Sequence, residues 1–404
     1  LMQVKLRMPN DLGFVNEASL KFNRRGEPPG TEATCELMFD ESHSSNKSGY
    51  STFVGKIRFE TPGYRTFYVK IRINEVEKTL KYDYETGNAV LTNADNPEFW
   101  EMFVYLSSFK TPSNIKGGIV YQIFVDTFCS KDLPNHLKER VVSWGTYPKW
   151  QKDPDGVFRN NQFYGGNLKG IIEKLPYIKS LHTTVIYLTP IFSSPSSNRY
   201  DISNFMEIDE MVGTWEDLRQ LHEKANQMGM SLILDLVFNH ASSENNWIKQ
   251  DPEMFAWIQK YSVAKCWWGY KHLTEFNQNS PSYLLKLAIC LSKYKEYVDG
   301  IRLDVADNLW DLTLKFIRVI FGKYILGEVW KNAITGDYRE FLYGEELDGV
   351  MNYQFPNSIY RWIRWGNAIN FRQVIGGICK LYPKEALDVS PIFLSSHDIP
   401  RIPN

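Results

Sequence analysis

The segment GIRLDVA, residues 300–306, decides the fold, because it begins as an apolar strand-like run and ends in an acid, Asp304. Three further segments have the same form, namely DLVFNH at residues 235–240, LGEVW at residues 326–330 and SSHD at residues 395–398. Helix-like stretches separate the four segments. A parallel α/β barrel presents its chemistry at the carboxyl ends of its strands in this way. We therefore expect Asp304, Glu328 and Asp398 to meet in one pocket.

The pattern that follows Gly118 supports such a barrel. Its near-continuous apolar runs are typical of parallel strands that are buried on both faces. We expect strands at residues 119–125, 184–192, 231–238, 300–305, 324–329, 349–353 and 391–396. Helical patterns separate these runs, for example residues 214–229, where Thr214 and Asp217 form a variant of the capping box. An eighth strand is expected beyond Asn404, so we predict a (β/α)8 barrel that lacks its last strand in this chain.

The N-terminal part of the chain has a different pattern. Short alternating runs that are typical of strands lie at residues 53–59, 66–73 and 103–107. We expect a β-sandwich domain over residues 1–113 and the barrel over residues 114–404. The stretch from about 239 to 281 is long for a connection and rich in tryptophan, and we expect it to be a functional insertion.

Composition limits the class of protein. The chain has 404 residues and a formal net charge of −1, so nothing indicates nucleic acid as a partner. No apolar run reaches the roughly 18 residues of a membrane helix. The five cysteines form no metal-binding spacing and no disulfide framework, which favours a reducing compartment. We expect a cytoplasmic protein; secretion stays open because the sequence starts at Leu1 rather than Met.

The spacing of Arg302 and Asp304 suggests a nucleophile. Residues two apart on a strand point to the same face, here the barrel interior. A neighbouring guanidinium lowers the pKa of a carboxyl group and keeps it ionised, which a nucleophile requires. The alternative is a structural salt bridge inside the barrel.

The acid at the end of the next strand, Glu328, has Trp330 on the same face. A carboxyl group beside an apolar aromatic wall stays protonated to higher pH, as a general acid requires. Asp398, preceded by His397, can stabilise the positive charge of an oxocarbenium-like transition state. The alternatives are a surface glutamate for Glu328 and a helix N-cap for Asp398.

Asn239 and His240 close the strand of the first segment. No second histidine lies at metal-ligand spacing, so we do not expect a catalytic zinc. The 15% aromatic content fits either core packing or the stacking of sugar rings on aromatic faces.

Taken together, the four segments resemble the four conserved segments of the alpha-amylase family of glycoside hydrolases, in the family's order. The stretches GGNLKGI (165–171) and NRYDISNF (198–205) extend the resemblance. The match is most similar to the neopullulanase, cyclomaltodextrinase and amylopullulanase branch, which VMNYQF (350–355) and the preceding sandwich support.

This resemblance implies a retaining mechanism on an alpha-linked glucan such as starch, pullulan, cyclodextrin or maltodextrin. Asp304 is then the nucleophile, Glu328 the acid/base and Asp398 the transition-state stabiliser. The implied substrate-binding residues are Tyr200, which stacks beneath the sugar ring, together with His240, Arg302, Trp330 and His397.

The resemblance also implies that no cofactor is required. Asn239 is a calcium ligand in many relatives, whereas CSKDLPN (129–135) lacks the acidic pattern of the family's other calcium segment. A homodimer through the N-terminal domain is a further expectation. A transglycosylase or isomerase of the same family and a non-catalytic glucan-binding relative stay open as alternatives.

Overall fold

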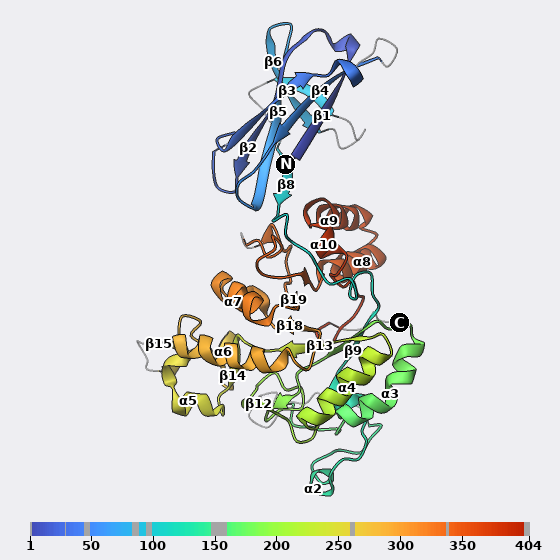
Figure 1. Ribbon diagram of the computed structural model, residues 1–404, viewed down its shortest axis with the longest axis vertical. Helices are drawn as coiled ribbons and strands as arrows, with labels where there is room; N and C mark the ends of the chain where they lie inside the picture. The colour runs from blue at the N-terminus through green and yellow to red at the C-terminus, as the bar shows by residue number, and fades with distance from the viewer. Residues whose placement is uncertain are drawn as a thin grey trace. The chain divides into compact units, whose positions relative to one another are not determined.

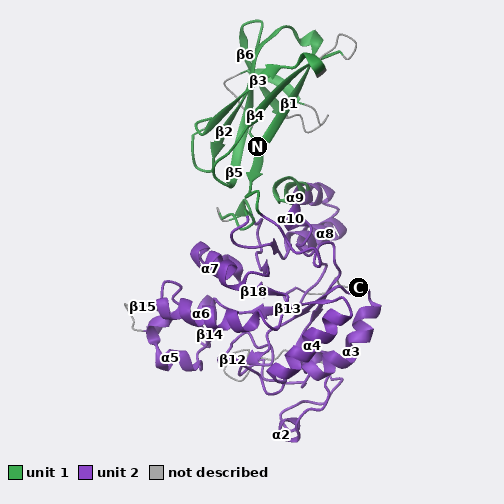
Figure 2. Ribbon diagram, viewed as in Figure 1, with its two compact units in different colours: residues 1–108, 334–343, 376–383 green, residues 109–333, 344–375, 384–404 purple. Residues whose placement is uncertain are grey.

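The computed structural model describes residues 2–28, 30–43, 49–82, 89–93, 99–146, 160–258, 263–336 and 339–399. The chain divides into two compact units, which Figure 2 shows in different colours. The first unit comprises residues 1–108, 334–343 and 376–383. The second comprises residues 109–333, 344–375 and 384–404.

An antiparallel sheet forms most of the first unit. Its strands follow the order β1-β4-β3-β2-β5-β6-β7, and β8 pairs with β5. The strands are β1 (Met2–Pro9), β2 (Val15–Arg24), β3 (Ala33–Phe39), β4 (Tyr50–Ile57), β5 (Gly63–Ile73), β6 (Val76–Tyr82), β7 (Ala89–Asn93) and β8 (Trp100–Val104). Two short 3-10 turns, η1 (Asn10–Leu12) and η2 (Glu41–His43), lie between them.

One apolar core joins the strands of this unit. Phe22 of β2, Cys35 of β3, Phe53 of β4, Ile71 of β5 and Leu80 of β6 are all buried in it. The three strand-like runs predicted from the sequence each overlap a strand, namely β4, β5 and β8. Alternation of apolar and polar residues therefore located these strands, of which β4 and β5 have buried residues and β8 is half-buried.

A six-stranded parallel sheet lies at the centre of the second unit, with the order β20-β19-β18-β13-β10-β9. The strands are β9 (Val120–Ile123), β10 (Val185–Leu188), β13 (Ser231–Leu236), β18 (Gly300–Leu303), β19 (Tyr324–Gly327) and β20 (Gly349–Val350). Every residue of β10, β13, β18 and β19 is buried. The prediction of a parallel sheet buried on both faces is therefore confirmed for these strands.

Helices separate most of these strands, and the last helices follow β20 (Figure 1). They are α1 (Val125–Phe128), α2 (Asn135–Lys138), α3 (Leu168–Ser180), α4 (Trp215–Gln227), α6 (Pro281–Tyr294), η6 (Ala306–Asn308), α7 (Asp311–Phe321), α8 (Gln354–Trp365), α9 (Ala368–Leu381) and α10 (Lys384–Leu387). The predicted capping box of α4 is present: the Thr214 hydroxyl accepts from the Asp217 N–H, and the Asp217 carboxylate accepts from the Thr214 N–H. None of the helices in the described segments has the length and apolar character of a membrane span.

The long stretch after β13 contains short elements of its own. They are β14 (His240–Ser242), α5 (Asn246–Gln250), η3 (Pro252–Met254), β15 (Trp257–Ile258), β16 (Val263–Ala264), η5 (Trp267–Gly269) and β17 (Leu273–Glu275). β14 pairs with β17, so both ends of the stretch are held together next to the parallel sheet. A separate two-stranded sheet, β11 (Phe192–Ser193) with β12 (Asn204–Ile208), follows β10.

The prediction of a seventh strand at residues 391–396 is wrong, since these residues form no strand. The Ser390 hydroxyl, rather than a strand carbonyl, accepts the Val350 N–H at 3.0 Å, and Pro391 has no N–H to give to a ladder. The expected strand at residues 349–353 is also shorter in the structure, since β20 ends at Val350. The parallel sheet is thus a half-barrel within the described residues, with β9 and β20 as its edges.

Candidate active site

Arg302 of β18 lies at the centre of a buried cluster of acids. Its Nη1 lies 2.9 and 3.0 Å from the two carboxylate oxygens of Asp235 and 2.8 Å from Asp304 Oδ1. Its Nη2 lies 2.8 Å from Glu328 Oε2 and 3.9 Å from Asp398 Oδ2. The guanidinium is fully buried. One positive charge therefore faces an excess of carboxylates in a site with little water, so the cluster favours any added positive charge.

The strand register explains this convergence. Asp235 of β13 stands opposite Arg302 of β18, and Arg302 stands opposite Leu326 of β19. Glu328 follows β19 directly, so it reaches the same end of the sheet. The structure thus brings together the three acids that the sequence singled out, and it adds Asp235. A charged residue inside the apolar run SLILDLVF was the sequence signal for Asp235, since buried charges are rare unless paired.

Glu328 accepts two N–H groups besides its ion pair with Arg302. The Val305 backbone N–H donates to Oε2 at 2.8 Å, and the Trp330 indole N–H donates to Oε1 at 2.8 Å. Burial raises the pKa of Glu328, but Arg302, these two donors and His397 together outweigh it, so the net pKa lies below the usual value. The expectation that Trp330 acts as an apolar wall is wrong, because the indole presents its N–H rather than its face.

Asp304 has the opposite electrostatics. Burial first, then the negative charge of Glu328 and that of Asp235, hold the pKa of Asp304 well above its usual range, and Arg302 offsets only part of this. The expectation that Arg302 keeps Asp304 ionised is therefore wrong for the ligand-free protein. The reason is that Arg302 is shared among several carboxylates instead of serving Asp304 alone.

Asp398 and His397 lie on the irregular segment that follows Pro391. The Tyr353 hydroxyl donates to Asp398 Oδ2, and His397 Nε2 lies 3.2 Å from Asp398 Oδ1. The two ring nitrogens of His397 also lie 2.5 Å from Gln122 Nε2 and 2.6 Å from the Tyr200 hydroxyl. These contacts hold Asp398 near Arg302 although no strand positions it.

Tyr200 joins this network to the acids. Its hydroxyl donates to Asp235 Oδ2 at 2.8 Å, and the Tyr187 hydroxyl donates to the same oxygen at 2.6 Å. The Tyr200 ring lies nearly parallel to that of His397, with ring centroids 5.5 Å apart. Burial raises the pKa of Asp235, and Arg302, His397 and the two tyrosine hydroxyls lower it in part. Tyr187 and Gln122 gave no sequence signal beyond their place at strand ends.

His240, the first residue of β14, is buried at the edge of the cluster. Its ring stacks on Trp267 with centroids 4.9 Å apart. Burial, followed by the nearby His272, lowers the pKa of His240 to about 3, and Glu328 offsets part of this. His240 is therefore neutral at physiological pH and can serve as a hydrogen-bonding group. Trp330 stacks on Tyr353 at a centroid distance of 3.9 Å, and 40% of its surface is exposed.

The surroundings of Asn239 do not fit a calcium ion. Asn239 lines a cavity of about 280 Å³, and among the described residues that line it Glu275 is the one carboxylate, which Lys265 Nζ neutralises at 2.6 Å. Calcium in proteins takes six to eight oxygen ligands, usually including several carboxylates. Among the described residues, no group of three or more histidine, cysteine or acidic side chains could hold a metal ion.

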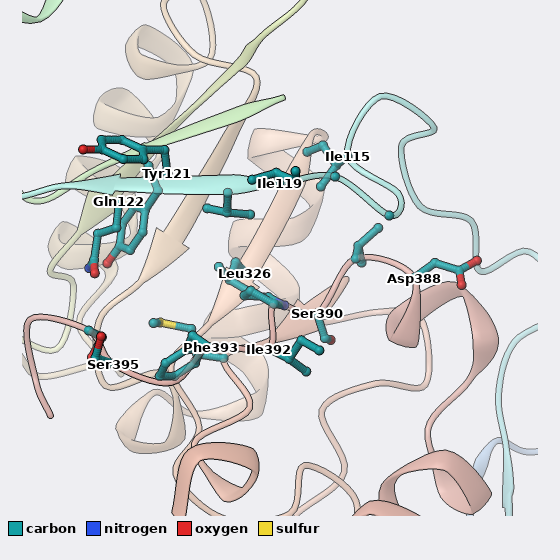
Figure 3. Close-up of a pocket in the computed structure, with 18 of the residues that line it drawn as sticks. Ile115, Ile119, Tyr121, Gln122, Leu326, Asp388, Ser390, Ile392, Phe393 and Ser395 are labelled. Atoms are coloured by element: carbon teal, nitrogen blue, oxygen red, sulfur yellow. The ribbon is translucent and has the colours of Figure 1, made fainter. Parts of the chain in front are cut away.

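A cavity of about 1070 Å³ reaches the cluster from the open side of the half-barrel. Figure 3 shows Tyr121 and Gln122 of β9 on one side of it, and Ser390, Ile392, Phe393 and Ser395 on the other. Tyr187 and His397 also line this cavity. At the end of the cavity away from Ser395, a hydrogen bond from the Gly117 N–H to the Asp388 carbonyl links its two sides. The cavity is thus a slot along the free edge of β9.

Comparison with known proteins agrees with this geometry. Residues 103–288 match the model of the alpha amylase catalytic domain. Neopullulanase 2 from Thermoactinomyces vulgaris is 31% identical over 428 residues, which cover 96% of this chain and 70% of that protein. The chain belongs to the alpha-amylase family of glycoside hydrolases.

Other relatives of this alpha-amylase family member are named amylopullulanase or cyclomaltodextrinase. Amylopullulanase from Thermoanaerobacterium thermosulfurigenes is 31% identical over 91% of the chain. The chain spans only 23 to 34% of the length of this and two other amylopullulanases. A solved cyclomaltodextrinase has the same fold with a TM-score of 0.64 and 21% identity, covering 98% of this chain and 68% of that one.

Proposed function

We propose that this protein is a retaining alpha-glucan hydrolase that cleaves alpha-1,4 glucosidic bonds, with alpha-1,6 bonds as a second class. The observation that carries the proposal is the convergence of Asp304, Glu328 and Asp398 on the buried Arg302. Glycoside hydrolysis needs a pair of carboxyl groups beside the scissile bond and a means of stabilising a cationic transition state.

The chemistry runs in two displacements. In the first, a carboxylate oxygen of Asp304 bonds to the anomeric carbon while the bond to the leaving oxygen breaks, and Glu328 gives that oxygen its proton. In the second, Glu328 takes a proton from water, whose oxygen displaces Asp304 and restores both groups. The excess negative charge around Arg302 stabilises the oxocarbenium-like character of both transition states.

This cycle requires one proton on the Asp304–Glu328 pair, placed on Glu328 when the sugar is bound. In the ligand-free protein the raised pKa of Asp304 and the lowered pKa of Glu328 favour the opposite placement. We propose that substrate binding moves this proton, because the glycosidic oxygen beside Glu328 can accept a hydrogen bond only from the protonated carboxyl group, whereas the Trp330 N–H donates to the charged one. The two carboxyl groups then titrate as a pair rather than singly.

The names of the relatives support an alpha-glucan as the substrate. They include amylopullulanase, neopullulanase 2 and cyclomaltodextrinase. Tyr200 contacts Asp235 and His397 contacts Asp398, and we propose that these two residues, with His240 and Arg302, hold the sugar at the cleavage point. We propose that Trp330, which donates to Glu328 and is partly exposed, contacts the leaving sugar.

We further propose the organisation of the whole molecule. The antiparallel N-terminal part is a β-sandwich over residues 1–113, which can form a homodimer, and residues 114–404 belong to a (β/α)8 barrel with an inserted domain at about 239–281. The shared core of β2 to β6 supports the sandwich. The reaction uses no cofactor. A cytoplasmic location accords with the name of one relative, an intracellular maltogenic amylase.

A product profile tests the proposed function. Soluble starch, pullulan and a cyclodextrin are incubated separately with the protein, and the products are separated by chromatography. Short maltosaccharides or panose are expected with the wild type and absent with Asp304→Asn, which should have the same melting temperature or a higher one. Equal products from both proteins, or none from a folded wild type, would overturn the proposal.

A further inference from the structure

Arg199, the residue before Tyr200, is buried and has an unusual backbone conformation. Its surface is only 1% exposed. Its φ of 61° lies in the left-handed region, which is unfavourable for a residue that has a Cβ atom. Strain of this kind persists only where the surrounding structure imposes it, and it concentrates at functional sites. The contacts of the Arg199 side chain must therefore stabilise the turn that contains it.

Three oxygen atoms surround the guanidinium of Arg199. Its Nη2 donates to Asp209 Oδ1 at 3.3 Å and lies 3.5 Å from Asp126 Oδ1. Its Nη1 donates to the Ser197 carbonyl at 2.8 Å. Both acids are buried, so water and salt screen these ion pairs little. The guanidinium therefore ties the turn at residues 197–200 to two other parts of the chain, α1 and the end of β12.

The two acids are themselves held in place. Asp126 lies in α1, directly after β9, and its second oxygen accepts the Tyr164 N–H at 2.8 Å. Asp209 follows β12, and its Oδ1 also accepts the Met211 N–H at 3.0 Å. Because backbone groups fix both carboxylates, the position of the Arg199 guanidinium is fixed as well.

The residue that follows Arg199 reaches the acid cluster. The Tyr200 hydroxyl donates to Asp235 Oδ2 at 2.8 Å and lies 2.6 Å from His397 Nε2. A backbone hydrogen bond also joins Tyr200 to His240. The backbone torsions of Arg199 set the direction in which the chain enters Tyr200. A change in the conformation of Arg199 would therefore displace the ring and the hydroxyl of Tyr200 together.

We propose that Arg199 is a positioning residue for cleavage, whose ion pairs with Asp126 and Asp209 hold the strained turn that presents Tyr200 to the acid cluster. The inference rests on the proposed function. Arg199 acts on the reaction through Tyr200 rather than by contact with the sugar. A purely structural ion pair would lower stability when removed, whatever residue follows it. A positioning residue loses its effect on turnover once the Tyr200 hydroxyl is absent.

A double-mutant cycle separates these two roles. The values of kcat and KM on maltoheptaose are measured for the wild type, Arg199→Met, Tyr200→Phe and the double variant, at a temperature at which circular dichroism shows all four folded. Arg199→Met should lower kcat/KM about tenfold, since a displaced Tyr200 hydroxyl loses a hydrogen bond to a charged group. On the Tyr200→Phe background the same change should cost less than about threefold. Arg199→Lys, which keeps the positive charge, should recover part of the loss.

The matched control is Arg65→Met. Arg65 is also a fully buried arginine, and it pairs with Glu32 at 2.6 Å in the first unit. Its removal should lower the melting temperature and leave kcat/KM within about twofold of the wild type. If Arg199→Met does not fold, Asp209→Asn, which leaves Asp126 to pair with Arg199, is taken through the same cycle.

The outcomes distinguish this inference from the proposed function. An equal loss of kcat/KM with and without the Tyr200 hydroxyl would overturn the inference alone. The same holds for an unchanged kcat/KM in Arg199→Met, or for an equal loss in Arg65→Met. A folded wild type that does not cleave maltoheptaose would overturn the proposed function and this inference with it.

Discussion

Arg302 and Asp235 form a buried pair in which one guanidinium nitrogen lies within 3.0 Å of both carboxylate oxygens. Both side chains are fully buried, and they come from neighbouring strands in register. The pair fixes the guanidinium that Asp304 and Glu328 share. Asp235 is thus a positioning residue, which acts on the reaction through Arg302.

Asp235→Asn should destabilise the protein by about 1.5–3 kcal/mol, because Arg302 keeps Asp304 and Glu328 as partners but loses its charged hydrogen bonds to Asp235. Turnover should fall as well, since Arg302 can then move away from the acids. Chemical denaturation and an assay on starch measure the two effects. The matched control is Asp388→Asn, which removes an exposed i,i+4 pair with Lys384 and should cost at most about 0.5 kcal/mol. Equal stability of the two variants would contradict this role of Asp235.

Trp330→Phe should move the acidic limb of the pH profile of kcat/KM, which reports the free protein, to higher pH. The change removes the N–H that donates to Glu328 Oε1 and keeps a ring that can stack on Tyr353. The pKa of Glu328 then rises, because its charged form loses a hydrogen bond. Trp362→Phe, which stacks on Phe371 away from the acids, should leave the profile unchanged. An unshifted limb in Trp330→Phe would show that Glu328 does not set it.

His240 should make stability depend on pH. Its pKa is lowered to about 3 by burial and His272, so between the ordinary histidine value and about 3 the unfolded chain binds the proton and the folded protein does not. The contribution of His240 to the free energy of unfolding is therefore complete above the ordinary histidine pKa and is lost as the pH falls below it. The stability difference between wild type and His240→Gln should shrink from pH 7 to pH 4. A constant difference between the two proteins over this pH range would contradict the assignment.

EDTA should leave the melting temperature unchanged. Lys265 already neutralises Glu275 in the cavity beside Asn239, so a cation has no carboxylate to bind there. The control is EDTA that has been saturated with calcium beforehand. A melting temperature that falls with EDTA and recovers with calcium would show a metal site that this account lacks.

Much of the second unit follows from its apolar runs. Strands such as SLILDL at residues 231–236 are buried throughout, so hydrophobicity alone located them. The prediction of the seventh strand was wrong for a related reason. PIFLSS has the apolar composition of a strand, but the Ser390 hydroxyl accepts the Val350 N–H in place of a backbone carbonyl of that strand. Composition indicates burial, whereas pairing depends on neighbours that are distant in sequence.

The site was predictable as a set of residues but not in its electrostatics. Residues at strand ends meet because the strands are parallel, which placed Asp304 and Glu328 together. Their pKa directions depend on contacts across strands, namely the Trp330 N–H and the position of Asp235. No spacing along the chain encodes those contacts, so the sequence assigned the two directions in reverse.

The most direct test of the central claim is to trap the covalent intermediate. The protein is incubated with a 5-fluoro-glycosyl fluoride of the alpha series, which slows the second displacement, and is then digested and analysed by mass spectrometry. The account predicts that the sugar adduct lies on the peptide GIRLDVADNLW and is attached to Asp304. An adduct on another residue, or steady turnover of glucan by protein that never forms an adduct, would contradict it.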